Sequence, residues 1–137
     1  MFMRQSVDSL SLKSTDKLQH KAMRNFENLL VWKKSCQLAC AVYEAFDKSR
    51  DYALVNQLTR ASVSIPSNIA EGSERHTEKE FVNFLYIAKG SAGELRTQIY
   101  IASKLGMITP QQQQDLITRC KEVSRMIARL INQIDNK

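Results

Sequence analysis

Glycine, proline and cysteine are scarce in this chain of 137 residues. It contains only 4 Gly and 2 Pro, too few for the many turns of a β-sandwich or barrel, so an all-β fold is disfavoured. Its 3 Cys are an odd number without the dense spacing of a disulfide scaffold, which favours a reducing cytoplasm. No run approaches 18 consecutive apolar residues and no secretory-type segment opens the chain, so we expect neither a membrane span nor export.

What the chain does contain is typical of one globular domain. Hydrophobic residues make up 43% and charged residues 25%, close to the average for folded proteins. The net charge of +6 favours a polyanion or an acidic protein surface as partner. Residues 1–25 lack a periodic apolar face, so we expect a flexible, disordered N-terminal extension followed by one domain over 26–137. That tail is basic, because two acidic residues oppose five basic ones: Arg4, Lys13, Lys17, Lys21 and Arg24.

Four segments of the domain carry apolar residues at steps of three and four, which is the period of one helix face. The predicted helices cover about 28–48, 51–73, 77–105 and 110–134. Asn28 is the expected N-cap of the first helix. Thr77 with Glu80 and Thr109 with Gln112 form capping-box patterns before the third and fourth. The short connections predict an all-α, antiparallel, up-down-up-down four-helix bundle.

Proline and glycine residues fall inside or at the ends of these predicted helices. Pro66 predicts a kink near residues 62–65 unless packing or serine side chains absorb it. Gly72 is expected to stop the second helix, whereas Gly90 and Gly93 lie inside the third and predict close helix contact. The apolar face expected for the first helix consists of Trp32, Cys36, Ala39, Val42, Tyr43 and Phe46.

The motifs of helical-bundle enzymes are missing. A di-iron bundle needs Glu-x-x-His on two helices, but Lys17 precedes His20 and Ser73 precedes His76 at that spacing. No arginine stands five to seven positions before either histidine, as the Arg-x4–6-His signature of helical RNases would require, and no phosphate loop or nucleophile elbow occurs. Cys36 and Cys40 lie one turn apart without a full ligand set, so we interpret them as buried apolar thiols. We expect no catalytic residue, metal or cofactor, and not an enzyme.

A cluster of polar residues lies on or beside the apolar stripes of the second and third helices. In one interpretation, Arg60 forms a buried or half-buried ion pair with Glu71 or Glu94, and Asn68 caps a strained turn beside Pro66. In the other, the same groups lie at a subunit interface or in an anion-binding groove. The cluster consists of Arg60, Asn68, Glu71, Gly72, Arg75 and Glu94.

The fourth helix carries a second candidate site. Lys121, Arg125 and Arg129 recur every four residues and therefore share one side of the helix, with Arg119 displaced by half a turn. The stripe is either an ordinary solvated face or a contact surface for a polyanion. Because no aromatic residues interleave it, base stacking is not supported, and it predicts nonspecific phosphate contacts.

Three segments resemble a known family. FENLLVW at residues 26–32, QLTRASVSIPSNIAEG at 57–72 and FVNFLYIAKGSAGEL at 81–95 are similar to four-helix-bundle proteins encoded in intervening sequences of bacterial 23S rRNA genes. That family is distantly similar to accessory proteins of diversity-generating retroelements. The resemblance extends from Phe26 to about Ile134, and the extension before Phe26 departs from it.

The resemblance implies a homopentamer around a central channel, and the retroelement relatives are basic proteins that associate with nucleic acid. It supplies no activity. The function expected is a non-enzymatic, oligomeric helical bundle that binds RNA or DNA weakly through Lys121, Arg125, Arg129 and Arg119. The alternative is a protein-interaction scaffold without a nucleic-acid role, whose basic surface meets an acidic protein.

Overall fold

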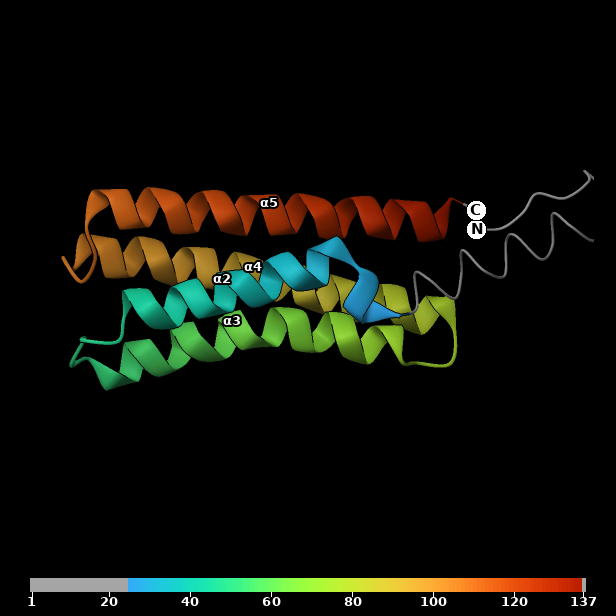
Figure 1. Cartoon of the computed structure of the whole chain (residues 1–137), viewed down its shortest axis with the longest axis horizontal. Helices are drawn as coiled ribbons and strands as arrows, with labels where there is room; N and C mark the ends of the chain where they lie inside the picture. Colours follow the sequence, from blue (N-terminus) through green and yellow to red (C-terminus); the bar gives the residue numbers. More distant parts are fainter. Residues whose placement is uncertain (1–24, 137) are drawn as a thin grey trace, which may run out of the picture.

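The computed structural model describes residues 25–136, and within them every regular element is a helix. A short 3-10 helix precedes four long α-helices (Figure 1). The predicted all-α, four-helix fold is confirmed. The prediction of a basic tail over 1–25 falls, apart from Asn25, outside the described residues. The elements are η1 (Phe26–Asn28), α2 (Leu30–Ala45), α3 (Tyr52–Ser73), α4 (Glu78–Lys104) and α5 (Pro110–Asp135).

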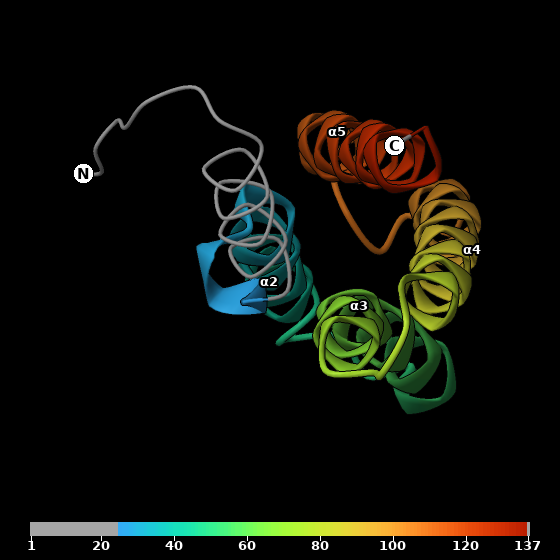
Figure 2. The same ribbon diagram turned by 90° about the vertical axis from the view of Figure 1, so that its right-hand side faces the viewer.

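The four long helices lie along one axis and run in alternating directions (Figure 1). Seen from the end, α3 lies beside α2 and α4, and α5 lies beside α4 (Figure 2). The hydroxyls of Ser64 and Ser91 join α3 to α4 at 2.8 Å, and Ser103 donates to Gln113 between α4 and α5. These contacts fix how the antiparallel neighbours are aligned along their length.

The helix starts follow the local sequence closely. The Asp51 carboxylate accepts a hydrogen bond from the backbone N–H of Leu54 at 3.1 Å and caps α3. Reciprocal capping boxes begin α4 at Thr77 and α5 at Thr109. Because Pro110 stands at the first turn of α5, its missing N–H leaves no helical hydrogen bond unmade. Both predicted capping boxes are confirmed.

The core fills the space between the four helices. Leu38, Leu58, Ile65, Leu95 and Ile127 are each 0% exposed, so every long helix contributes to it. Burying one such side chain contributes about 1.5–3 kcal/mol to folding. The apolar face predicted for the last helix is buried throughout: Leu116, Ile117, Cys120, Val123, Ile127, Leu130, Ile131 and Ile134.

The first helix differs from the prediction. It begins at Leu30 with Leu29 as N-cap, and Asn28 belongs to the preceding 3-10 turn, where the Phe26 ring packs edge-on against Trp32 at 5.1 Å. This apolar packing replaces a side-chain cap. The helix also ends earlier, at Ala45. Its buried face is shifted from the predicted one: Tyr43 is 53% exposed, and the buried residues are Val31, Ser35, Leu38, Ala39 and Val42.

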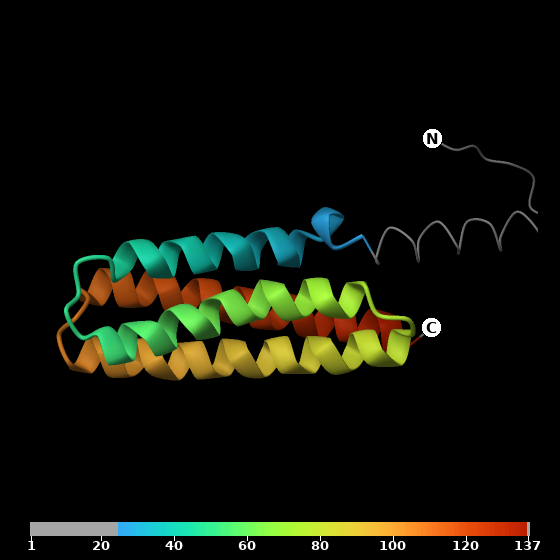
Figure 3. The same cartoon turned by 90° about the horizontal axis from the view of Figure 1, so that it is seen from below.

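Pro66 and Gly72 do not break the second long helix. α3 continues through the buried Pro66 as a single helix that curves along its length (Figure 3). Gly72 lies inside α3, one residue before its end, and touches α4 rather than stopping the helix. Gly90 and Gly93 face open space, since a methyl group built on either meets no atom within 4 Å. Within residues 25–136, the two glycines therefore make no close contact with another helix.

Candidate nucleic-acid interface

The basic stripe of α5 lies opposite its buried face. Lys121, Arg125 and Arg129 are all exposed, and none forms an ion pair with an acidic side chain of residues 25–136. The polar residues Thr118 and Asn132 extend the same exposed side. The three cations can therefore approach an external anion without first breaking an ion pair within residues 25–136.

The acidic neighbours of the stripe are already paired. Glu122 on α5 reaches Lys34 on α2 with 3.3 Å between Oε2 and Nζ. Arg119 donates from Nε to Asp115 at 3.0 Å. Arg119 thus differs from the other three cations, although the sequence grouped it with them.

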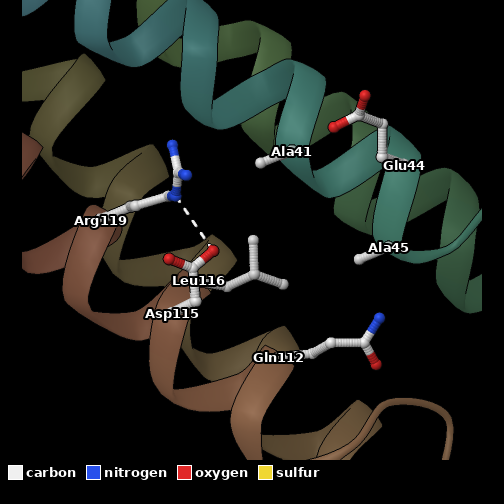
Figure 4. A pocket seen from close by; sticks show the side chains of 7 residues that line it. All are labelled: Ala41, Glu44, Ala45, Gln112, Asp115, Leu116 and Arg119. Carbon is white, nitrogen blue, oxygen red and sulfur yellow. Dashed lines mark hydrogen bonds and ion pairs between the residues drawn. The ribbon is translucent and has the colours of Figure 1, made fainter.

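Arg119 also faces another part of the molecule. It lines a pocket of about 240 Å³ between α2 and α5 (Figure 4), together with Ala41, Glu44, Ala45, Gln112, Asp115 and Leu116. Figure 4 shows the Arg119 side chain next to the Asp115 carboxylate across one turn of α5. The two carboxylates of the pocket make it a poor place for a phosphate, so the candidate interface is confined to the exposed stripe.

Helix α4 adds cations that the sequence analysis missed. Arg96 lies close enough to Cys120 of α5 for its charge to act on that thiol. Lys89 stands two turns earlier on the same side of α4, because seven residues return a helix to the same side. Both side chains are at least partly exposed. The spacing of Lys89 and Arg96 shows that they share one side of α4. The sequence does not show that this side lies next to α5, so the two residues were not included in the candidate site.

The three cysteines occupy different environments. Burial raises the pKa of the Cys120 thiol to about 12, against a smaller lowering effect of Arg96. Burial and the neighbouring Cys40 also raise the pKa of Cys36, which is half-buried. Cys40 is exposed, so the interpretation of Cys36 and Cys40 as buried thiols is wrong for Cys40. No group of three metal-binding side chains gathers within residues 25–136.

Part of the polar cluster builds the turn between α3 and α4. Arg75 donates from Nε and Nη2 to Glu80 at 3.3 Å, and its guanidinium lies 5.3 Å from the centre of the Phe84 ring. Glu71 lies 4.0 Å from the same guanidinium. Desolvation raises the pKa of the Glu80 carboxyl, but hydrogen bonds from Arg75 and Thr77 and the Arg75 charge outweigh it, so the pKa falls below its usual value.

The other residues of the polar cluster do not form the buried ion pair that the sequence predicted. Arg60 and Glu94 are both exposed, and neither has an ion-pair partner among the described residues. The prediction of a buried or half-buried pair between Arg60 and Glu71 or Glu94 is therefore wrong. Asn68 caps no turn: its Nδ2 donates to the carbonyl and the hydroxyl of Ser64 inside α3.

These features define a class of protein: a helical bundle whose last helix carries a basic stripe without ion pairs among the described residues. No helix within residues 25–136 is long and apolar enough to cross a membrane. The chain belongs to the family of 23S rRNA-intervening sequence proteins, whose family model matches residues 27–129.

A solved structure supports the same fold. It is the crystal structure of a protein of unknown function from the S23 ribosomal protein family of Bacteroides thetaiotaomicron VPI-5482, with a TM-score of 0.71 and 23% sequence identity. The match covers 74% of this chain and 98% of that one. At this identity the likeness concerns the fold alone. None of the curated proteins matches the chain.

Proposed function

We propose that this protein is a non-enzymatic, oligomeric helical bundle that binds RNA or DNA weakly through backbone phosphates. The observation that carries the proposal is the α5 stripe, in which Lys121, Arg125 and Arg129 are exposed and have no acidic partner among the described residues. Arginine donates two parallel hydrogen bonds to a phosphate, and lysine acts as a point charge. Arg119 contributes less, since Asp115 already binds it.

The assembly that we propose is the homopentamer that the family resemblance implies. Three cations on each chain become fifteen in a ring of five, and a repeated patch of one sign attracts a polyanion more strongly than a single copy does. Lys89 and Arg96 on α4 would widen each patch. A cytoplasmic location is part of the proposal and is supported by three free thiols.

Nucleic-acid-free protein, titrated with a mixed-sequence RNA at 50 and 200 mM salt, tests this proposal. Three phosphate contacts per chain predict a loss of affinity of about 20-fold over that range, with little dependence on the RNA sequence. The variant Arg125→Glu/Arg129→Glu should lose most of the binding at low salt. Lys33→Glu/Lys48→Glu on α2 and its following turn is the matched control, because it changes the net charge equally at two other exposed positions.

Two results would contradict the proposal. If both double variants lost binding equally, net charge rather than the stripe would attract the RNA. If the wild-type protein did not bind RNA at 50 mM salt, the alternative of a scaffold for an acidic protein would replace it. An acidic polypeptide titrated on the same sample would then bind with its own salt dependence.

A further inference from the structure

The outer face of α4 is unusually apolar for a surface without a partner. Nine large hydrophobic side chains of the described residues are exposed; four of them lie on α4, and a fifth belongs to Leu105, the C-cap of that helix. Two adjacent pairs stand 14 residues apart, which is nearly four turns, so both pairs lie on one side of α4. The five side chains are Tyr86, Ile87, Tyr100, Ile101 and Leu105, with exposed fractions from 41% to 63%.

Two glycines lie in the middle of the same face. Gly90 and Gly93 are separated from Ile87 and Tyr100 by whole turns of the helix, and a methyl group on either would meet nothing within 4 Å. Each lowers helix stability by about 1 kcal/mol relative to alanine. No contact inside the described part of the chain accounts for them. A helix surface without Cβ atoms lets the backbone or a bulky side chain of another molecule approach closely.

Charges of both signs flank this apolar face along the seam with α3. The hydroxyl contact between Ser64 and Ser91 and the contact of Gln57 with Gln98 at 3.5 Å align the two helices. Arg60 lies between the two α3 positions and Glu94 between the two α4 positions, so both stand in the same stretch of the seam. Both are exposed and without an ion-pair partner among the described residues.

We infer that this outer face of α3 and α4 packs against a second copy of the chain, with Arg60 of one copy meeting Glu94 of the next. The inference rests on the oligomeric part of the proposed function and assigns its surface. Because the unpaired cation lies on α3 and the unpaired anion on α4, the contact joins the α3 side of one copy to the α4 side of the next, head to tail, as a closed ring of identical chains requires. Gly90 and Gly93 leave room on the α4 side for side chains of the neighbouring copy.

The size of this surface suits a subunit contact. Helices of 22 and 27 residues are about 33 and 40 Å long, and two side by side are about 20 Å wide. In outline their common outer face is therefore roughly 650 Å², wide enough for α3 to contact one neighbouring copy and α4 the other. Figure 2 shows α3 and α4 side by side, with their outer sides directed away from α2 and α5.

The first experiment measures solution mass by light scattering. Ile87→Glu/Ile101→Glu introduces two carboxylates on the face and should reduce the assembly to single chains, while circular dichroism and cooperative melting show that the bundle remains folded. Leu30→Glu/Tyr43→Glu is the matched control, since these α2 side chains are 57% and 53% exposed and lie outside the face. The control should keep the wild-type mass.

A charge exchange tests the contact between Arg60 and Glu94 directly. Arg60→Glu and Glu94→Arg should each weaken assembly about tenfold or more. The double variant Arg60→Glu/Glu94→Arg should restore it, because the opposite charges meet again across the interface. Rescue of this kind does not follow from a merely structural role, because the two residues form no ion pair within one chain.

The outcomes separate this inference from the function on which it rests. A wild-type monomer would overturn both. A wild-type oligomer that Ile87→Glu/Ile101→Glu leaves intact would overturn the assigned surface and leave the proposed oligomer standing. Loss of assembly in the α4 variant, retention in the α2 control and rescue by the charge exchange would support the assignment.

Discussion

At the residue scale, the environment of each glycine decides what that glycine does. A methyl group on Gly72 would lie 2.6 Å from Cβ of Phe84, 3.0 Å from the Phe81 ring and 3.2 Å from the Phe81 carbonyl oxygen. The first of these separations is shorter than carbon atoms tolerate, so α3 and α4 approach closely here because Gly72 has no side chain. Gly90 has the same helical setting without any neighbour within 4 Å.

Alanine at these two positions should have opposite effects on the free energy of unfolding. Gly72→Ala should lower it by about 1–3 kcal/mol, because overpacking exceeds the gain in helix propensity. Gly90→Ala should raise it by up to about 1 kcal/mol in a monomeric background such as Ile87→Glu/Ile101→Glu, where only helix propensity changes. Urea unfolding followed by circular dichroism measures both. If Gly72→Ala were as stable as the wild type, α3 and α4 could move slightly apart at this point without lowering the free energy of unfolding.

At the element scale, the connection between α3 and α4 is stabilised by one arginine. Arg75 follows α3, binds Glu80 in the first turn of α4 and lies against the Phe84 ring. Glu80 is at the same time the second half of the capping box, since its carboxylate accepts from the N–H of Thr77 at 3.3 Å. The end of one helix and the start of the next are thus joined through a single carboxylate.

This arrangement predicts a pH dependence. Because the pKa of Glu80 is lower in the folded state than in the unfolded chain, its contribution to stability is present above the unfolded pKa and is lost as the pH falls through the folded value. Arg75→Gln should therefore melt below the wild-type temperature at pH 7, and the difference should narrow in acid. Melting curves from pH 7 to pH 3 measure it. A difference that stays constant with pH would show that stacking on Phe84, rather than the carboxylate, explains the effect of Arg75.

At the scale of the whole molecule, two different surfaces are proposed for assembly and for nucleic-acid binding. The outer face of α3 and α4 is assigned to contact between copies, and α5 presents the basic stripe. Linked copies bind a long polyanion more tightly than separate ones, because after the first contact the next is intramolecular. Assembly and nucleic-acid binding are therefore expected to be coupled even though they use different residues.

The coupling can be measured with the α4 variant. Ile87→Glu/Ile101→Glu keeps Lys121, Arg125 and Arg129 intact, yet it should bind a long mixed-sequence RNA at least tenfold more weakly per chain than the wild type. A short oligonucleotide that reaches only one copy controls for the two added negative charges, and its affinity should change much less. Equal losses for the long and short RNA would indicate a charge effect and contradict the coupling.

The sequence by itself determined which elements form and where most of them begin. Apolar residues at steps of three and four identified four helices, and the capping boxes at Thr77 and Thr109 fixed two helix starts, because both signals depend on contacts within a few residues of the chain. The α5 stripe was equally predictable, since the buried face of one long amphipathic helix defines its exposed side. The start of α2 was not, because packing of Phe26 on Trp32 replaces a local cap.

Only the tertiary structure decided what the polar and glycine residues do. Helix spacing alone does not show that Gly72 touches α4 while Gly90 and Gly93 face outward. Arg60 was predicted to be half of a buried ion pair, but packing places it on the surface, without an ion pair among the described residues. These roles depend on distances between residues far apart in the chain, which helical periodicity does not encode, because it fixes only the side of a helix on which a residue lies.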